Sequence, residues 1–294
     1  MAFSVNTNAG AMAALQSLNA TNKGMNQVQS RINTGFNVAS TKDDSAKYTV
    51  AQTLRGDLGK LSAVTTSLNN AKSVTDVAVA GAEQISDLVN EMKSKTLETS
   101  DAGLDAESRK AIAKDLVALK KQIGTIIDGS DFNGTNLLKG TAVATDGKVS
   151  ALQSISGAET LTVDNQGFTT KAETAFGAWS GTPSNTDIDA ISTAADGDAA
   201  KTAADAFTAK LDTFFGEVKD SLSEMGAASR QIDGQLSFNS KLTDVVTTGV
   251  GNLVDADLAK ESATLQALQV QQQLGTQALS IANQAPQTIL SLFR

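Results

Sequence analysis

The chain has 294 residues, with 24 basic and 32 acidic side chains, and so a net charge of -8 near pH 7. An acidic surface repels the phosphate backbone, which argues against nucleic acid as a partner. The sequence contains neither Cys nor His. This absence excludes disulfides, thiol catalysis, imidazole general-base catalysis and the usual zinc sites, so we expect neither an enzyme nor a cofactor.

No window approaches the roughly 18 consecutive apolar residues of a membrane span, so no membrane segment is expected. The first residues lack a basic region followed by an apolar run, which predicts no ordinary secretory signal. Prolines occur only at Pro183 and Pro286, so long helices can run without interruption.

The first predicted helix is almost uncharged, since no charged side chain occurs among residues 1–22. Asn6, Thr7 and Asn8 are suitable cap residues before it. Its apolar side chains recur at helical spacing and form one face: Leu15, Leu18, Met25, Val28 and Ile32.

Residues 34–44 then read as a connection, in which Gly35 favours a turn and is a candidate hinge. The next helix carries apolar residues at alternating steps of four and three from Val50 to Met92. A heptad repeat sustained over this length predicts coiled-coil-like packing, and at 1.5 Å per residue a rod. We expect the core of a single subunit to cover most of this stripe.

A break near Gly103 separates this helix from a second one that begins at about Asp105, and the short connection predicts an antiparallel return. From 141 to 170 the pattern favours a β-hairpin, with strands at 161–163 and 167–170. Residues 172–198 read as surface loops. A third long helix is predicted to start near Ala199 and to break at Gly249 and Gly251, which are candidate hinges.

The last helix carries two apolar seams, which lie roughly 200° apart at about 100° per residue. One seam is Val254, Leu258, Leu265, Leu268, Leu279 and Ala282, and the other is Leu253, Ala256, Ala263, Ala267, Val270, Leu274, Ala278 and Ile281. A helix with two opposed seams needs neighbours on both faces. Two short helices cannot cover both, so we expect contacts between copies of the chain. The predicted interface also includes Leu290, Leu292 and Phe293.

The fold class is therefore mainly α: a rod of long antiparallel helices, with paired N- and C-terminal helices and a small β-hairpin excursion. Residues 1–43 and 252–294 form the predicted terminal coiled-coil domain. Residues 44–251 form the predicted helical rod domain, with a β and loop region at 141–198.

Several segments, in this order and near both ends, resemble bacterial flagellins, and most closely alphaproteobacterial flagellins with short variable regions. They are Val5-Asn6-Thr7-Asn8, Gln29 to Gly35 leading to Asp43-Asp44, Asp131-Phe132-Asn133-Gly134 to Leu138, and Asn252 to Ser262 continuing to Gln284 and Arg294. Together they cover about the first 140 and the last 95 residues.

The resemblance implies a filament subunit for motility, whose terminal helices form an inner tube and whose rod forms an outer layer. It also implies secretion through type III export, an extracellular location, and an export chaperone, a cap and hook-filament junction proteins as partners besides further copies of the chain. In members that the vertebrate innate-immune receptor detects, an Arg precedes the Glu-Leu of the second helix. Asn90 stands in that place here, which argues against recognition.

Two other functions fit parts of the pattern. A hook-filament junction protein shares the paired helical ends but forms a ring of limited size. A membrane-surface or calmodulin-like target binder also uses amphipathic ends, but it needs a basic polar face, whereas Gln and Ser occupy that face here.

An acidic cluster at Asp255, Asp257 and Glu261, with Lys260 among them, is the one group that suggests metal or acid-base chemistry. Charge bias at a helix N-terminus and pairing with Lys260 explain the same spacing. We therefore expect no catalytic or metal site there.

Overall fold

The computed structural model describes residues 8–101, 103–140, 147–178 and 185–292, with side chains up to residue 284 in the last helix. The chain divides into two compact units. One comprises the residues up to 58 together with those from 243 onward, and the other comprises 59–242. The predicted domain boundaries lie at 43/44 and 251/252.

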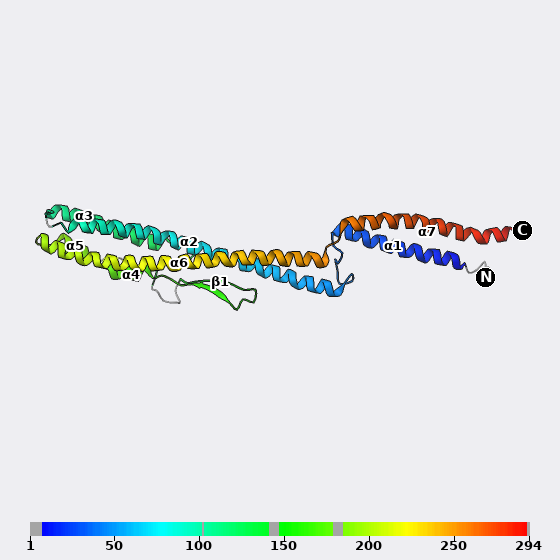
Figure 1. Cartoon of the computed structure of the whole chain (residues 1–294), viewed down its shortest axis with the longest axis horizontal. Helices are drawn as coiled ribbons and strands as arrows, with labels where there is room; N and C mark the ends of the chain where they lie inside the picture. The colour runs from blue at the N-terminus through cyan, green and yellow to red at the C-terminus, as the bar shows by residue number, and fades with distance from the viewer. Residues whose placement is uncertain (1–7, 102, 141–146, 179–184, 293–294) are drawn as a thin grey trace. The chain divides into compact units, whose positions relative to one another are not determined.

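The described elements are helical except for one pair of strands, which confirms the predicted fold class (Figure 1). They are α1 (Ala9–Thr34), α2 (Ser45–Thr99), α3 (Ala106–Gly129), β1 (Val149–Leu152), β2 (Thr160–Val163), α4 (Phe168–Phe176), α5 (Thr186–Ser192), α6 (Gly197–Val254) and α7 (Leu258–Leu292). Helices α2 and α6 each contribute to both units.

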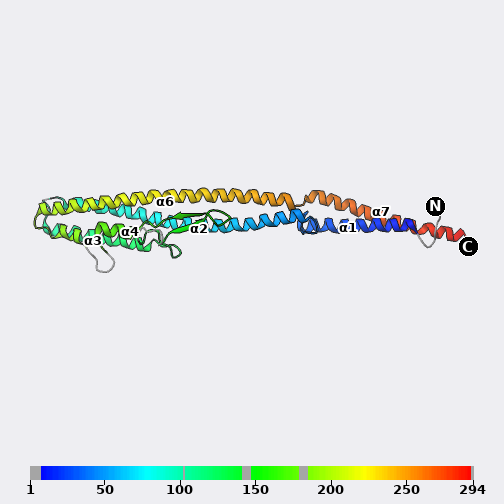
Figure 2. The same ribbon diagram turned by 90° about the horizontal axis from the view of Figure 1, so that it is seen from below.

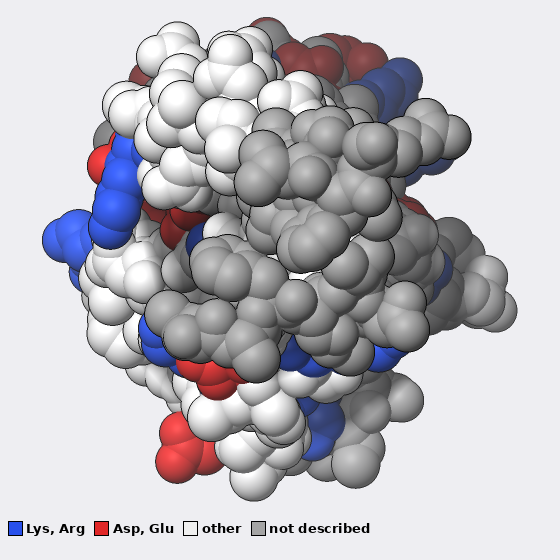
Figure 3. Space-filling model, turned by 90° about the vertical axis from the view of Figure 1, so that its right-hand side faces the viewer, with Lys and Arg blue, Asp and Glu red and all other residues white. Residues whose placement is uncertain are grey.

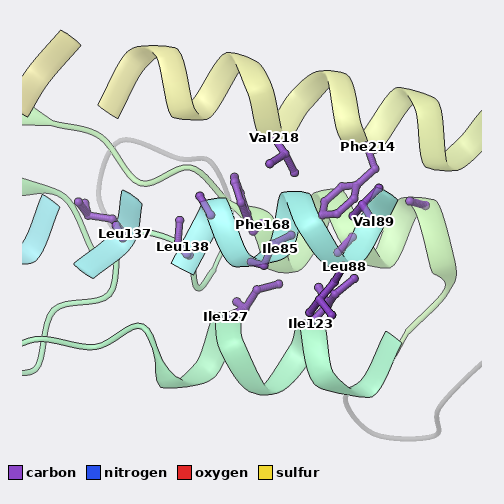
Figure 4. Close-up of a cluster of buried hydrophobic side chains, with 14 of the residues drawn as sticks. Ile85, Leu88, Val89, Ile123, Ile127, Leu137, Leu138, Phe168, Phe214 and Val218 are labelled. Atoms are coloured by element: carbon purple, nitrogen blue, oxygen red, sulfur yellow. The ribbon is translucent and has the colours of Figure 1, made fainter. Parts of the chain in front are cut away.

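The core of the unit 59–242 is the predicted heptad stripe of α2. From Leu61 to Met92 every position of that stripe is buried, whereas Val50, at its start, is half exposed. Helices α3 and α6 cover the stripe from either side (Figure 4). The prediction that one subunit covers most of this seam is confirmed.

Polar pairs accompany the packing of α2 against α6. Lys72 pairs with Asp233 and Lys93 with Asp212 at the surface. Asn239 is buried and its side-chain amide donates to the Leu61 carbonyl at 2.9 Å. A polar side chain among apolar neighbours satisfies its hydrogen bonds in few alignments, so Asn239 favours one register of α2 against α6.

The β-hairpin contains only one of the two predicted strands: β2 includes the predicted strand 161–163, and its partner β1 was not predicted. Strands β1 and β2 pair antiparallel, with Val149 opposite Val163. The strand predicted at 167–170 is wrong, because Phe168 begins helix α4. Gly167 precedes it in the left-handed region at φ 60°, and the Phe168 ring is fully buried against the Phe214 ring, with 6.1 Å between their centroids.

The prediction that 172–198 is surface loop is also wrong in large part. Helices α4 and α5 lie in this range, and Phe176, Ile188 and Ile191 are buried. The buried ammonium of Lys120 on α3 holds the two helices together, because it donates to the carbonyls of Phe176 at 3.0 Å and Ala178 at 3.3 Å, and to the side chain of Asn185 at 3.1 Å. Burial lowers the pKa of Lys120.

The helix break predicted at Gly249 and Gly251 is wrong, since α6 continues to Val254. Val250 and Val254 are buried in a small core with Val38 and Ala51, and this packing keeps the last turns helical despite the glycines. A hinge role for these glycines stays a prediction.

Candidate assembly surface

Helices α1 and α7, both in the unit that contains the chain ends, lie side by side in two perpendicular views (Figures 1 and 2). The first helix is capped at both ends. Asn8 accepts a hydrogen bond from the Ala11 amide at 3.1 Å, and Gly35 ends the helix in the left-handed region at φ 74°. Asp257 caps the start of α7 by accepting from the amides of Ala259 and Lys260.

The two helices run antiparallel, since contacts late in α1 meet early positions of α7. Arg31 pairs with Glu261 at 3.2 Å. Gln272 donates to the side chain of Asn22 at 2.8 Å. At the far end, the side chain of Asn8 donates to the Ala282 carbonyl at 2.7 Å. These contacts fit one common register, and they confirm that the first and last helices pair.

Only one of the two predicted seams of α7 is covered by α1. Along the covered seam, Leu265, Leu268, Leu279 and Ala282 are partly buried. The opposite seam is exposed from Ala263 to Ile281, and we call it the outward seam: Ala263, Ala267, Val270, Leu274, Ala278 and Ile281. Its larger side chains keep 55% (Val270), 58% (Leu274) and 67% (Ile281) of their surface exposed.

The apolar face predicted for α1 divides between two sides of the helix. Leu18, Met25, Val28 and Ile32 turn toward α7 and are partly or fully buried. Leu15 does not belong to this face and is 49% exposed. It lines a shallow groove along α1 with Met12, Ala13, Gln16 and neighbouring residues. The outer side of α1 thus carries exposed apolar side chains beside the polar Gln16, Asn19 and Lys23.

Described charged side chains are rare along this pair of helices. Between Glu261 and Arg294 the sequence has none, and α1 carries only Lys23 and Arg31. Viewed from the side where the chain ends lie, much of the described surface is white (Figure 3). The outward seam is thus both apolar and free of charges that would oppose its burial.

The connection 35–44 is tied to the end of α6. The amides of Asn37 and Val38 donate to the Val254 carbonyl, and the Ala256 amide donates to the Gly35 carbonyl. Asp43 accepts from the Ser40 hydroxyl at 3.0 Å and from the amides of Ser40 and Ala39. These bonds, the one from the Ser40 side chain foremost, lower the pKa of Asp43.

The acidic cluster has structural roles. Asp257 is the cap of α7, and Glu261 pairs with Arg31 of α1. Within the described part of the chain, acidic side chains nowhere gather in a group of three or more that could hold a metal ion. Among those same residues, none of the helices combines the length and apolarity needed to cross a membrane.

The predicted interface residues of the last helix thus fall on two helices and on different sides of α7, since Val254 is the last residue of α6 and Leu258 is the first of α7. Val254 is buried in the small core at the end of α6, and Leu258 is 49% exposed. Leu290, Leu292 and Phe293 lie outside the residues whose side chains are described. Sequence reasoning missed the contacts that align α1 with α7, although Gly24 and Gly275 in helix interiors were a signal for close packing.

Comparison with known proteins identifies the family. Residues 5–143 match the model of the bacterial flagellin N-terminal helical region, and 208–293 match that of the C-terminal helical region. The chain belongs to the flagellin family. It is similar to flagellin FljM of Caulobacter vibrioides, with 41% identity over 99% of this chain and 98% of the relative. A Brucella melitensis flagellin is 37% identical over 99% of both chains.

A solved structure supports the fold alone. It is assigned to a flagellar hook-associated protein from Vibrio parahaemolyticus, and it aligns with a TM-score of 0.58 over 72% of this flagellin and all of that chain, at 16% identity. The full-length flagellin relatives decide between the alternatives left open by the sequence. The chain is a structural subunit of the bacterial flagellar filament, which is extracellular.

Proposed function

We propose that the filament is held together through the outward seam of α7 and the outer side of α1, each covered by a neighbouring copy of the chain. The observation that carries the proposal is the exposure of the outward seam, whose large side chains remain more than half exposed in the single chain. Burial of apolar surface contributes about 25 cal/mol per Å². Assembly is the step that removes this surface from water.

The two outer faces also differ from each other, which favours a head-to-tail contact over a symmetric dimer. The seam of α7 projects Val270, Leu274 and Ile281, whereas the outer side of α1 is a shallow groove with Met12 and Leu15 on its rim. When unlike faces of identical subunits meet, the contact is heterologous, and it yields a ring or a helical filament. Repeated contact of α7 with the α1 groove of the next copy satisfies this geometry.

We assign the terminal helices, residues 1–43 and 252–294, to an inner tube, and residues 44–251 to an outer layer. The scarcity of charged side chains on α1 and α7 supports the first assignment, because charges buried between subunits require partners. The extensive core of the unit 59–242 supports the second, since that unit covers its own heptad stripe. Gly35, Gly249 and Gly251 remain the predicted hinges.

Further partners follow from membership of the family. We propose that the subunit is secreted through type III export, that a chaperone covers the outward seam before export, and that a cap and the junction proteins contact it during assembly. We propose no enzymatic activity. Asn90 is exposed on α2 and lacks the guanidinium of receptor-recognised members, so recognition by the innate-immune receptor is not expected.

The test is assembly of a chain trimmed to residues 44–251, compared with the full chain at equal concentration by electron microscopy. We expect the full chain to form long filaments. The trimmed chain should stay soluble and monomeric while it keeps the helical circular dichroism of the unit 59–242. Filaments grown from the trimmed chain would overturn the assignment of the assembly surface to α1 and α7.

A further inference from the structure

We propose that Gly24 and Gly275 are positioning residues, which fix the register of α1 against α7 by each receiving a leucine of the opposite helix. Where the inference concerns assembly, it rests on the proposed function. The register matters because it sets where the outward seam of α7 stands relative to the groove of α1.

The two contacts are reciprocal. A Cβ atom at Gly275 would lie 3.3 Å from Cδ1 and 3.8 Å from Cβ of Leu18, and only 4.0 Å from the Leu18 Cα. A Cβ atom at Gly24 would lie 3.6 Å and 3.7 Å from the two methyl carbons of Leu268. Each helix therefore offers one leucine and one glycine, as in the packing of a knob into a hole. The contact at Gly275 is the tight one, whereas the distances at Gly24 are those of ordinary van der Waals contact.

Several other helical glycines have no such neighbour. A Cβ atom at Gly56, Gly59, Gly234 or Gly249 would meet nothing within 4 Å. Glycine in a helix interior costs roughly 0.5–1 kcal/mol relative to alanine. At Gly275 that cost is offset by the close approach of Leu18, which sets it apart from the open glycines.

The other contacts between the helices select a register only weakly. A shift of three residues places Asn22 against Gln269, which offers another amide, whereas a shift of four places it against Leu268 or Thr276. The Arg31–Glu261 pair is partly exposed, and such pairs contribute about 0–1 kcal/mol. The polar contacts therefore oppose some slips but leave others open.

The packing at Gly24 and Gly275 opposes a shift of one helix along the other. A shift of one turn in either direction places Leu18 against Leu279 or Gln271 instead of Gly275. It also places Leu268 against Val28 or Ala20 instead of Gly24. Leu18 meets a large side chain in either direction, and overpacking of this kind costs about 1–3 kcal/mol. Leu268 is overpacked only against Val28, since Ala20 is small.

One turn of slip would displace the outward seam by about 5.4 Å along α1. In a helical polymer every subunit makes the same contact with its neighbour, so a misplaced seam misses the groove of every next copy. The packing at Gly24 and Gly275 thus specifies which pairing of the terminal helices can extend the filament.

A cysteine cross-link reads the register directly, because the chain has no Cys of its own. A Cβ atom at Gly10 would lie 4.0 Å from the Ala282 Cβ, within the usual range for a disulfide. The native reporter is Gly10→Cys with Ala282→Cys. The reporter for a slip of one turn is Gly10→Cys with Ala278→Cys. On mild oxidation, the native reporter should close at least tenfold faster than the slipped one.

The variant Gly275→Leu should slow closure of the native reporter about tenfold and raise that of the slipped reporter. Thr276→Leu, which adds bulk at the adjacent exposed position, is the matched control and should leave both rates unchanged. Closure of the native reporter at an unchanged rate in Gly275→Leu would overturn the inference.

A second variant separates loss of register from loss of folding. Adding Leu18→Ala to Gly275→Leu moves the hole to the other helix, and it should restore rapid closure of the native reporter. No restoration would overturn the inference, whatever the circular dichroism of the single variant. Filament growth is then measured on the same variants without the cysteines. Variants that close the native reporter rapidly should form filaments, and variants that close it slowly should not. Normal growth of a variant that has lost the native register would contradict the proposed assembly surface and leave the register role intact.

Discussion

Leu274→Ala removes the side chain at the centre of the outward seam and tests whether assembly buries that seam. The substitution deletes three carbons, and each is worth about 0.8 kcal/mol when it passes from water to a fully buried site. Because Leu274 is 58% exposed in the single chain, somewhat more than half of that value remains to be gained on assembly. The expected loss is about 1.4 kcal/mol per subunit added, or roughly tenfold in critical concentration.

The assay is the critical concentration for filament growth, obtained from the protein left in the supernatant after polymerisation and centrifugation. Leu97→Ala is the matched control, since it removes the same carbons from a side chain that is 70% exposed in the unit 59–242. Leu97→Ala should change the critical concentration less than twofold. An equal rise for both variants, or no rise for Leu274→Ala, would refute the reasoning.

Three further predictions concern single contacts. Asn239→Leu should preserve or raise the thermal stability of the unit 59–242 but loosen the register of α2 against α6. Spin-label distances between the two helices should then show a broadened distribution, and a narrow distribution would contradict the role of Asn239. Lys120→Met leaves the carbonyls of Phe176 and Ala178 without their donor. We therefore expect the free energy of unfolding to fall by about 1–2 kcal/mol and amide exchange in α4 and α5 to become faster. Unchanged exchange there would show that Lys120 does not hold α4 and α5 together. The pKa of Asp43 lies below its ordinary 3.8, so the stabilisation that its carboxylate gives to the connection 35–44 is present above that pH and is lost as the pH falls through the lowered pKa. Amide exchange in residues 36–44 should show this acid transition in the native chain and not in Asp43→Asn. An identical transition in both proteins would exclude Asp43 as its source.

The long helices could be predicted because their signal is repeated many times. In α2 the apolar stripe recurs over several heptads, so a single deviation such as Thr75 does not obscure it, and Thr75 satisfies its hydroxyl by donating to the Ala71 carbonyl within the helix. The two seams of α7 were likewise readable, because helical geometry alone places them on opposite faces.

Of the short elements only β2 was predicted, as the strand 161–163. The others were not, because tertiary packing overrides local preference there. Phe168 and the threonines after it favour a strand by propensity, yet burial of the Phe168 ring against Phe214 fixes a helix. The apolar signal of α5 is only Ile188 and Ile191, too few to show a period. Gly249 weakens a helix in isolation, but the burial of Val250 and Val254 sustains it.

The contacts that align α1 with α7 were missed for another reason. Glycine in a helix interior predicts lower helix stability, and only the structure shows that the Leu18 side chain of the opposite helix packs against Gly275. A sequence does not state which residue of one helix faces which residue of another. The outward seam could be predicted without this knowledge, but its position along the axis of α1 could not.

The central claim is that the outward seam is exposed in the single chain and covered in the filament. Val270→Cys supplies the only thiol of the chain, on a side chain that is 55% exposed. Its rate of alkylation, measured below the critical concentration and again in washed filaments, tests the claim most directly. The account predicts rapid alkylation of the free subunit and at least a hundredfold slower reaction in the filament; equal rates in the two states would contradict it.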